Sequence, residues 1–114
     1  MSRDWVGVDP TTDPVLATHF LFHDVDLATL RWALGTLRLF TSLATAYAEQ
    51  PSVDPRAIPA TYVLPVHDRT LRPSWMAQAC RDRLGVEPVE VDAGHCPHVS
   101  RPGLVADLVL TDVR

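Results

Sequence analysis

The sequence contains no lysine and no asparagine, so its ten basic residues are all arginines. These arginines are scattered along the 114 residues, and the formal net charge is −4. A nucleic-acid-binding surface needs clustered positive charge to neutralise phosphates. We therefore expect no nucleic-acid partner.

Cysteines and long apolar runs are also scarce. Only Cys80 and Cys96 are present, too few for a disulfide framework, and there is no secretory signature. No stretch approaches the ~20 consecutive apolar residues that span a bilayer. These absences predict a cytoplasmic protein with two reduced thiols and no membrane contact.

The composition that remains is that of an ordinary folded domain, 46% hydrophobic and 21% charged. Its pattern divides the chain into three parts. We expect a helical segment at 1–49, a proline-rich linker at 50–59 and a strand–helix region at 60–114. The linker follows from its three prolines, which no helix or central strand would accommodate.

Two helix starts stand out in the first part. Asp13 followed by Pro14 is a cap and first-turn signal, and a second cap follows at Asp26. After Asp26, apolar residues recur at three- and four-residue steps, which predicts an amphipathic helix over 26–40. The stretch 41–48 either continues this helix or starts another.

The last part alternates between strand and helix. The pattern predicts strands at 60–66 and 88–91, each followed by a helix, at 73–84 and 102–110. This β-α-β-α unit implies an α/β fold with two parallel strands joined by a right-handed crossover. Sheets usually have about five or six strands, so we expect this sheet to be completed by further strands.

Asp68 and His95 each follow the end of a predicted strand by a few residues. The carboxyl ends of parallel strands meet at one edge of a sheet, where α/β proteins build their sites. A carboxylate there can orient an imidazole for general-base work. On spacing alone a simpler interpretation stays open, with Asp68 capping a turn and His95 an ordinary loop histidine.

The sequences PVHDRTLRP at 65–73 and GHCPHVSRP at 94–102 resemble the acid and histidine segments of α/β-hydrolases. The resemblance is closest to the small esterase and hydroxynitrile-lyase-like branch, whose patterns are D-x-x-[IL]-x-P and G-H-x-P-x-x-S-x-P. The sequence FLFHDVD at 20–26 resembles the end of that family's lid, so the likeness covers roughly residues 15–110. The matching fixed positions are Asp68, Leu71, Pro73, Gly94, His95, Pro97, Ser100 and Pro102.

This resemblance implies a partial α/β-hydrolase fold, in which a helical lid remnant precedes the β-α-β-α part of the core. It makes Asp68 the triad acid and His95 the general base of a carboxylic-ester hydrolase that needs no cofactor and no metal. The family's nucleophile is missing, because none of the five serines lies in a G-x-S-x-G elbow. No histidine precedes a glycine either, so the usual oxyanion-hole segment is absent as well.

The chain is therefore expected to be inactive alone and to act on a small-molecule ester only if an N-terminal half completes it. The alternative is a non-enzymatic interaction module, or a truncated or split-gene fragment. Either would self-associate or dock on a partner subunit through the exposed sheet edge, because unpaired edges favour pairing.

Other nucleophiles are weaker candidates. Cys80 lies at core spacing on its predicted helix, and the side chain of Cys96 should diverge from that of His95. Ser100 is better explained as a helix cap before Pro102.

Metal binding is also a weak interpretation. His95, Cys96 and His98 with Asp92 lack a second ligand pair elsewhere. The short run at 23–26, with one histidine and two aspartates, is better explained by helix capping and a solvated surface. Apolar helix faces similarly make Trp32 and Trp75 packing residues, although Trp32 keeps a lesser role as a lid aromatic that contacts substrate.

Overall fold

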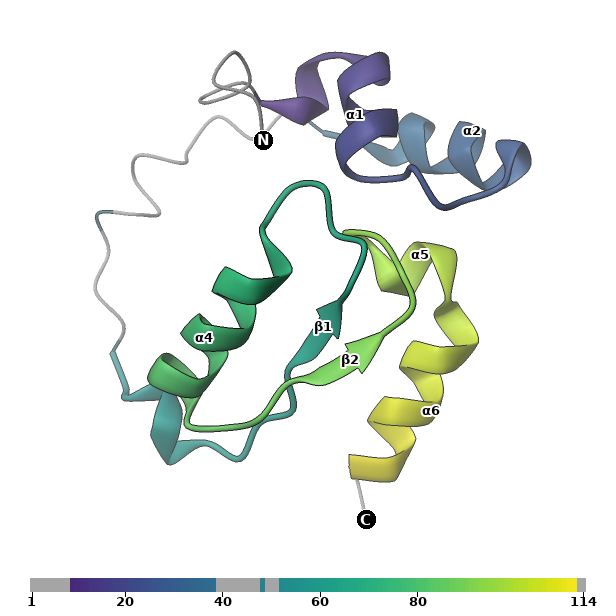
Figure 1. The fold of residues 1–114 in the computed structure, drawn as a ribbon. Helices are drawn as coiled ribbons and strands as arrows, with labels where there is room; N and C mark the ends of the chain where they lie inside the picture. The colour runs from purple at the N-terminus through teal and green to yellow at the C-terminus, as the bar shows by residue number, and fades with distance from the viewer. Residues whose placement is uncertain (1–8, 39–47, 49–51, 113–114) are drawn as a thin grey trace.

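The computed structural model describes residues 9–38, 48 and 52–112 (Figure 1). It is a mixed α/β structure with helices around a two-stranded parallel sheet. The elements in chain order are η2 (Pro10–Thr12), α1 (Pro14–Phe20), α2 (Leu27–Thr36), η3 (Pro55–Ala57), β1 (Val63–Pro65), α4 (Pro73–Leu84), β2 (Val89–Val91), α5 (Pro97–Ser100) and α6 (Pro102–Asp112).

The sheet consists of β1 and β2, which run parallel and are joined by α4. Val63 pairs with Val89 and Pro65 with Val91. The predicted parallel β-α-β unit is thus confirmed, although both strands are shorter than expected and the first begins at Val63 instead of position 60. The pairing is extended by one bond before Val63, because the N–H of Val89 donates to the carbonyl of Tyr62 at 2.8 Å.

Backbone pairing continues past the ends of both strands. The N–H of Val66 donates to the carbonyl of Val91 at 3.0 Å, and that of His67 to the carbonyl of Ala93 at 3.1 Å. The two loops therefore leave the sheet side by side. Figure 1 shows α1 and α2 beyond this carboxyl end of the strands.

The two N-terminal helices begin where the caps predict. Asp13 accepts from the N–H of Val15 at 2.7 Å, and Asp26 accepts from the N–H of Thr29 at 2.8 Å. The second helix ends at Thr36, earlier than position 40, because Leu37 turns to extended backbone. Gly35 in its last turn lowers helix propensity by up to ~1 kcal/mol relative to Ala. Positions 39–47 lie outside the described residues.

The later helices also follow their sequence signals. The α4 helix spans 73–84 as predicted and ends on Gly85, whose φ of 71° places it in the left-handed cap conformation. The α6 helix runs two residues past its predicted end, and a short helix at 97–100 precedes it that the pattern did not indicate.

The expected linker at 50–59 contains η3, and its positions 50 and 51 lie outside the described residues. Asp54 caps this turn by accepting from the N–H of Arg56 at 2.9 Å. The guanidinium of Arg56 donates to the carbonyl of Asp82 in α4. The described part of the linker therefore packs on the last helical turn instead of merely connecting two parts.

The described core is small. Its buried apolar residues are Ala17, Phe20, Phe22, Ala33, Leu64, Cys80, Val91 and Ala93. Trp32 and Trp75 are 62% and 52% exposed, so their prediction as packing residues is wrong. The guanidinium of Arg83 lies over the ring of Trp75, 5.8 Å from its centroid, and this leaves about half of that side chain exposed. None of the described helices is long and apolar enough to cross a membrane.

Candidate active site

Asp68 and His95 meet at the carboxyl end of the sheet, where the paired loops leave β1 and β2. The Nδ1 atom of His95 lies 2.9 Å from Oδ2 of Asp68. The predicted proximity of these two side chains is thus confirmed. Because a carboxylate only accepts, Nδ1 carries the proton, and Nε2 of the neutral ring is left as the base.

The Asp68 carboxylate is held by both oxygens. Oδ1 accepts from the backbone N–H groups of Thr70 at 2.7 Å and Leu71 at 2.9 Å, while Oδ2 faces His95. Asp68 therefore caps the following turn and also orients the imidazole, so the two interpretations of this residue are compatible. Its side chain is only 6% exposed, against 26% for His95.

The environment keeps Asp68 ionised. Burial raises the pKa of this carboxyl, but hydrogen bonds from His95, Leu71 and Thr70 outweigh burial and leave the pKa below its usual value. An ionised partner stabilises the imidazolium that forms when His95 takes a proton. The pair is thus arranged for proton transfer at Nε2.

We call Asp68 and His95 the dyad. His23 and Asp24, in the loop between α1 and α2, contact the two loops that carry the dyad residues. Nε2 of His23 donates to the carbonyl of His67 at 2.9 Å, and Oδ2 of Asp24 accepts from the N–H of Gly94 at 2.6 Å. We call these two contacts the His23–Asp24 bridge. Each contact is made to the residue directly before Asp68 or His95.

A third contact supports the same junction, since the Thr70 hydroxyl donates to the carbonyl of Phe20 at 2.9 Å. Sequence analysis assigned His23 and Asp24 only to capping and a solvated surface, and so missed this bridge. The available signal was their position inside the FLFHDVD sequence.

Gly94 is required by this close approach. A Cβ atom at this position would lie 2.8 Å from both Oδ1 of Asp24 and Nε2 of His23. A side chain here would push the Asp24 and His23 side chains out of the bridge, and this explains why glycine suits the position before His95.

The carboxylate of Asp24 also stays ionised. Burial raises its pKa, but the N–H of Gly94 and the Ser100 hydroxyl lower it more, so the pKa lies below its usual value. Neither the Ser100 hydroxyl oxygen nor Oδ1 of Asp24 has a hydrogen-bond partner of standard geometry among the described residues. Ser100 closes α5 and makes no cap bond, so its prediction as the cap before Pro102 is wrong.

Neither cysteine is suited to be the nucleophile. Burial raises the pKa of Cys96 to about 11, and the charges of Asp68 and Asp24 act in the same direction. Its thiol is therefore protonated at neutral pH, whereas the thiolate is the reactive form. Cys80 is buried as predicted, with Sγ 3.3 Å from the carbonyl of Val86.

His67 lies beside the dyad but points elsewhere, with Nε2 2.8 Å from Oδ1 of Asp92. This contact engages one of the ligands considered for a metal with His95, Cys96 and His98. Among the described residues, no three His, Cys, Asp or Glu side chains are grouped to hold a metal ion.

In the described part of the chain, no serine or cysteine is hydrogen-bonded to the dyad as a nucleophile would be. No hydrogen bond links His95 Nε2 to a serine or cysteine within residues 9–38, 48 and 52–112. Ser2 and Ser42 lie outside these residues. The site therefore holds a base and its orienting acid.

Comparison with known proteins adds no further constraint. No protein-family model matches the chain, and no curated protein or solved structure is significantly similar to it. The functional argument consequently depends on the geometry of Asp68, His95 and the His23–Asp24 bridge.

Proposed function

We propose that this chain carries the acid–histidine half of a serine-type α/β-hydrolase active site, with a carboxylic ester as its substrate class. The observation that supports this proposal best is the 2.9 Å contact between His95 Nδ1 and Asp68 Oδ2 at the ends of neighbouring parallel strands. The motif resemblance at 65–73 and 94–102 supports the same assignment from sequence.

In the proposed reaction, Nε2 of His95 takes the proton of a serine hydroxyl as that oxygen attacks the ester carbonyl. His95 then returns the proton to the leaving alcohol. Water, deprotonated by the same nitrogen, attacks the acyl-enzyme and releases the acid and the serine. Asp68 fixes the tautomer and stabilises the imidazolium throughout.

The serine and the oxyanion donors would come from a second polypeptide or segment that carries the missing strands. Such a partner would pair with the free edge of the two-stranded sheet and cover apolar side chains such as Trp32 and Trp75. The α1–α2 segment would then serve as the lid, fixed to the dyad loops by the His23–Asp24 bridge.

Complementation tests this proposal. The chain is mixed with a separately expressed N-terminal half of a small esterase that ends before its lid, and hydrolysis of an activated ester is measured. We expect no hydrolysis and no fluorophosphonate labelling of the chain alone, and both in the mixture. His95→Ala should remove the ester turnover of the mixture, whereas His98→Ala, a matched exposed histidine three positions later, should leave it unchanged.

Two results would contradict the proposal. One is complemented activity that His95→Ala leaves intact. The other is stoichiometric labelling of a serine in the isolated chain, which would mean that the nucleophile is already present.

A second candidate function is that of a non-enzymatic interaction module. It is favoured by the apolar exposure of α6, where Val109 and Leu110 face solvent. This module would bind its partner without gaining esterase activity. The same mixture distinguishes the two, because a complex that forms but never labels with fluorophosphonate supports the module.

A further inference from the structure

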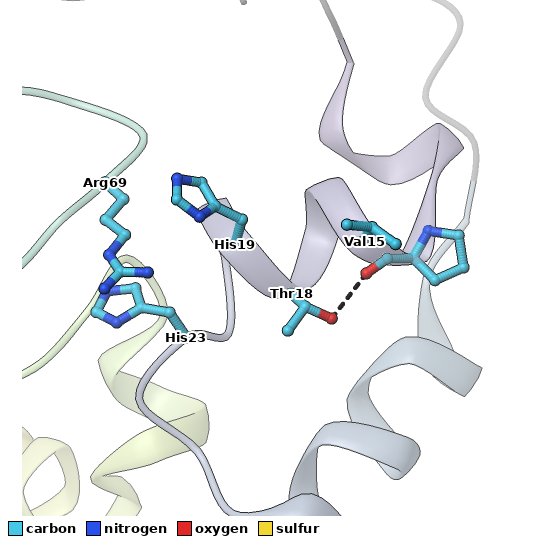
Figure 2. A pocket seen from close by; sticks show the side chains of 6 residues that line it. Val15, Thr18, His19, His23 and Arg69 are labelled. Carbon is cyan, nitrogen blue, oxygen red and sulfur yellow. Dashed lines mark hydrogen bonds between the residues drawn. The ribbon is translucent and has the colours of Figure 1, made fainter.

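A pocket of about 510 Å³ lies between α1 and the loop that follows β1 (Figure 2). This volume is within the range of small-molecule sites. Neither member of the dyad lines it. Its lining residues are Pro14, Val15, Thr18, His19, His23 and Arg69.

The pocket is basic in an acidic protein. Arg69 is permanently charged, and no acidic side chain lines the pocket. Arg69 takes no part in the ion pairs found among the described residues. The Thr18 hydroxyl is already used, since it donates to the carbonyl of Pro14 at 2.7 Å. The positive charge of Arg69 therefore favours an anion.

The other end of the pocket is apolar. Figure 2 shows Val15 at the end away from Arg69 and His23, with His19 one turn along the same helix α1. Pro14 continues this wall, and Val15 is 74% exposed. A ligand that fits both walls has an anionic head and a short apolar chain.

We propose that this pocket binds a small aliphatic carboxylate. The guanidinium of Arg69 would hold the carboxylate by charge-assisted hydrogen bonds, with His19 and His23 beside it. The aliphatic chain would lie on Val15 and Pro14.

The pocket adjoins the dyad without belonging to it. Arg69 directly follows Asp68, and His23 donates to the carbonyl of His67. The bound carboxylate would therefore contact the backbone segment that carries Asp68 without contacting the dyad side chains. Binding itself does not require the hydrolase proposal, and either can fail without the other.

Titration of the isotopically labelled chain with hexanoate tests the proposal, with the side-chain NMR signals of Arg69, His19 and His23 as the readout. Hexanol offers the same chain without charge, and inorganic phosphate offers charge without a chain. We expect saturable shifts with hexanoate and at least about tenfold weaker binding of both comparators.

Arg69→Gln should weaken hexanoate binding about tenfold or more. The control is Arg31→Gln, which removes the same charge from an exposed position on α2 and should leave binding unchanged. Val15→Ser probes the apolar wall independently and should weaken hexanoate while leaving phosphate unaffected. Both arginines are exposed, so matching amide spectra should verify that each variant keeps the fold.

Four results would overturn the proposal. Hexanol binding as tightly as hexanoate would exclude carboxylate recognition, and phosphate binding as tightly would exclude the apolar wall. If Arg69→Gln and Arg31→Gln lost the same hexanoate affinity, the binding would come from general charge attraction and not from this pocket. An absence of saturable shifts with hexanoate would exclude the site.

Discussion

Asp68 uses its two oxygens for different purposes, and this division links local folding to the proposed chemistry. One oxygen caps the turn at Thr70 and Leu71, and the other orients His95. Loss of the negative charge should therefore disturb the turn and the imidazole together. The same residue then affects both stability and proton transfer.

The pH dependence of stability should report this charge. The pKa of Asp68 is lower in the folded chain than its usual value, so its stabilisation is complete above the unfolded-state pKa of about 3.9. It is lost as the pH falls through the lower folded-state pKa. We expect urea unfolding from pH 7 to 2 to show a shallower acid loss of unfolding free energy in Asp68→Asn than in the wild type.

Asp24 contributes in the same direction, because its pKa is also lowered. The Asp68→Asn curve should therefore remain pH-dependent in acid. Asp92→Asn is the matched control, since it removes an exposed carboxylate that contacts His67. If the unfolding free energy of Asp68→Asn fell as steeply with decreasing pH as that of the control, the prediction would be contradicted.

Gly94→Ala should separate the α1–α2 segment from the histidine loop. The new methyl group would collide with Asp24 and His23, and overpacking of this kind costs about 1–3 kcal/mol of unfolding free energy. Gly103→Ala is the control, because a Cβ there meets nothing within 4 Å. Denaturant unfolding measures both, and equal stability of the two variants would refute the proposed close contact.

At the scale of elements, helix ends were the most predictable feature. Asp13, Asp26 and Gly85 have local signals that determine where a helix begins or ends, and the structure uses all three. The pairing of Asp68 with His95 was predictable too, because parallel strands bring their carboxyl ends together. The extent of each strand was not, since it depends on neighbours that local sequence does not specify.

The His23–Asp24 bridge shows a second limit of prediction from sequence. It joins residues 44 and 70 positions apart, and no periodicity or spacing rule connects such distant positions. The small helix at Pro97–Ser100 and the exposure of Trp32 were missed for a related reason. Both depend on tertiary surroundings instead of local propensity.

The same glycine substitution should have opposite effects in two helices. Gly85→Ala forces a side chain into the left-handed conformation of the α4 cap and should cost about 1–2 kcal/mol. Gly35→Ala lies inside α2 with open space at its Cβ and should gain up to ~1 kcal/mol. Thermal and urea unfolding followed by circular dichroism would detect both shifts, and shifts of the same sign would contradict the cap assignment.

At the scale of the whole molecule, apolar exposure is the dominant feature. A two-stranded sheet leaves each strand with a free edge, and such edges with apolar side chains nearby mark interfaces. The exposed large apolar residues are Val15, Leu27, Trp32, Val53, Ile58, Val66, Leu71, Trp75, Val89, Leu104, Val109 and Leu110.

We therefore expect the purified chain to bind the dye ANS and to self-associate. Size-exclusion chromatography with light scattering should show species larger than the 12.6 kDa monomer, and replacing Val109 and Leu110 with glutamate should shift them toward monomer. The N-terminal half used for complementation should reduce dye binding. A compact monomer with cooperative unfolding and no dye binding would mean that these residues suffice as a domain.

The His23–Asp24 bridge also carries a thermodynamic consequence. Because it contacts the residues that precede both dyad members, docking of the α1–α2 segment and assembly of the proton-transfer pair are linked equilibria. Linkage is reciprocal, so whatever strengthens the pairing of Asp68 with His95 must draw the segment onto the sheet to the same degree. A ligand that engages only one of these regions would thereby change the population of the other.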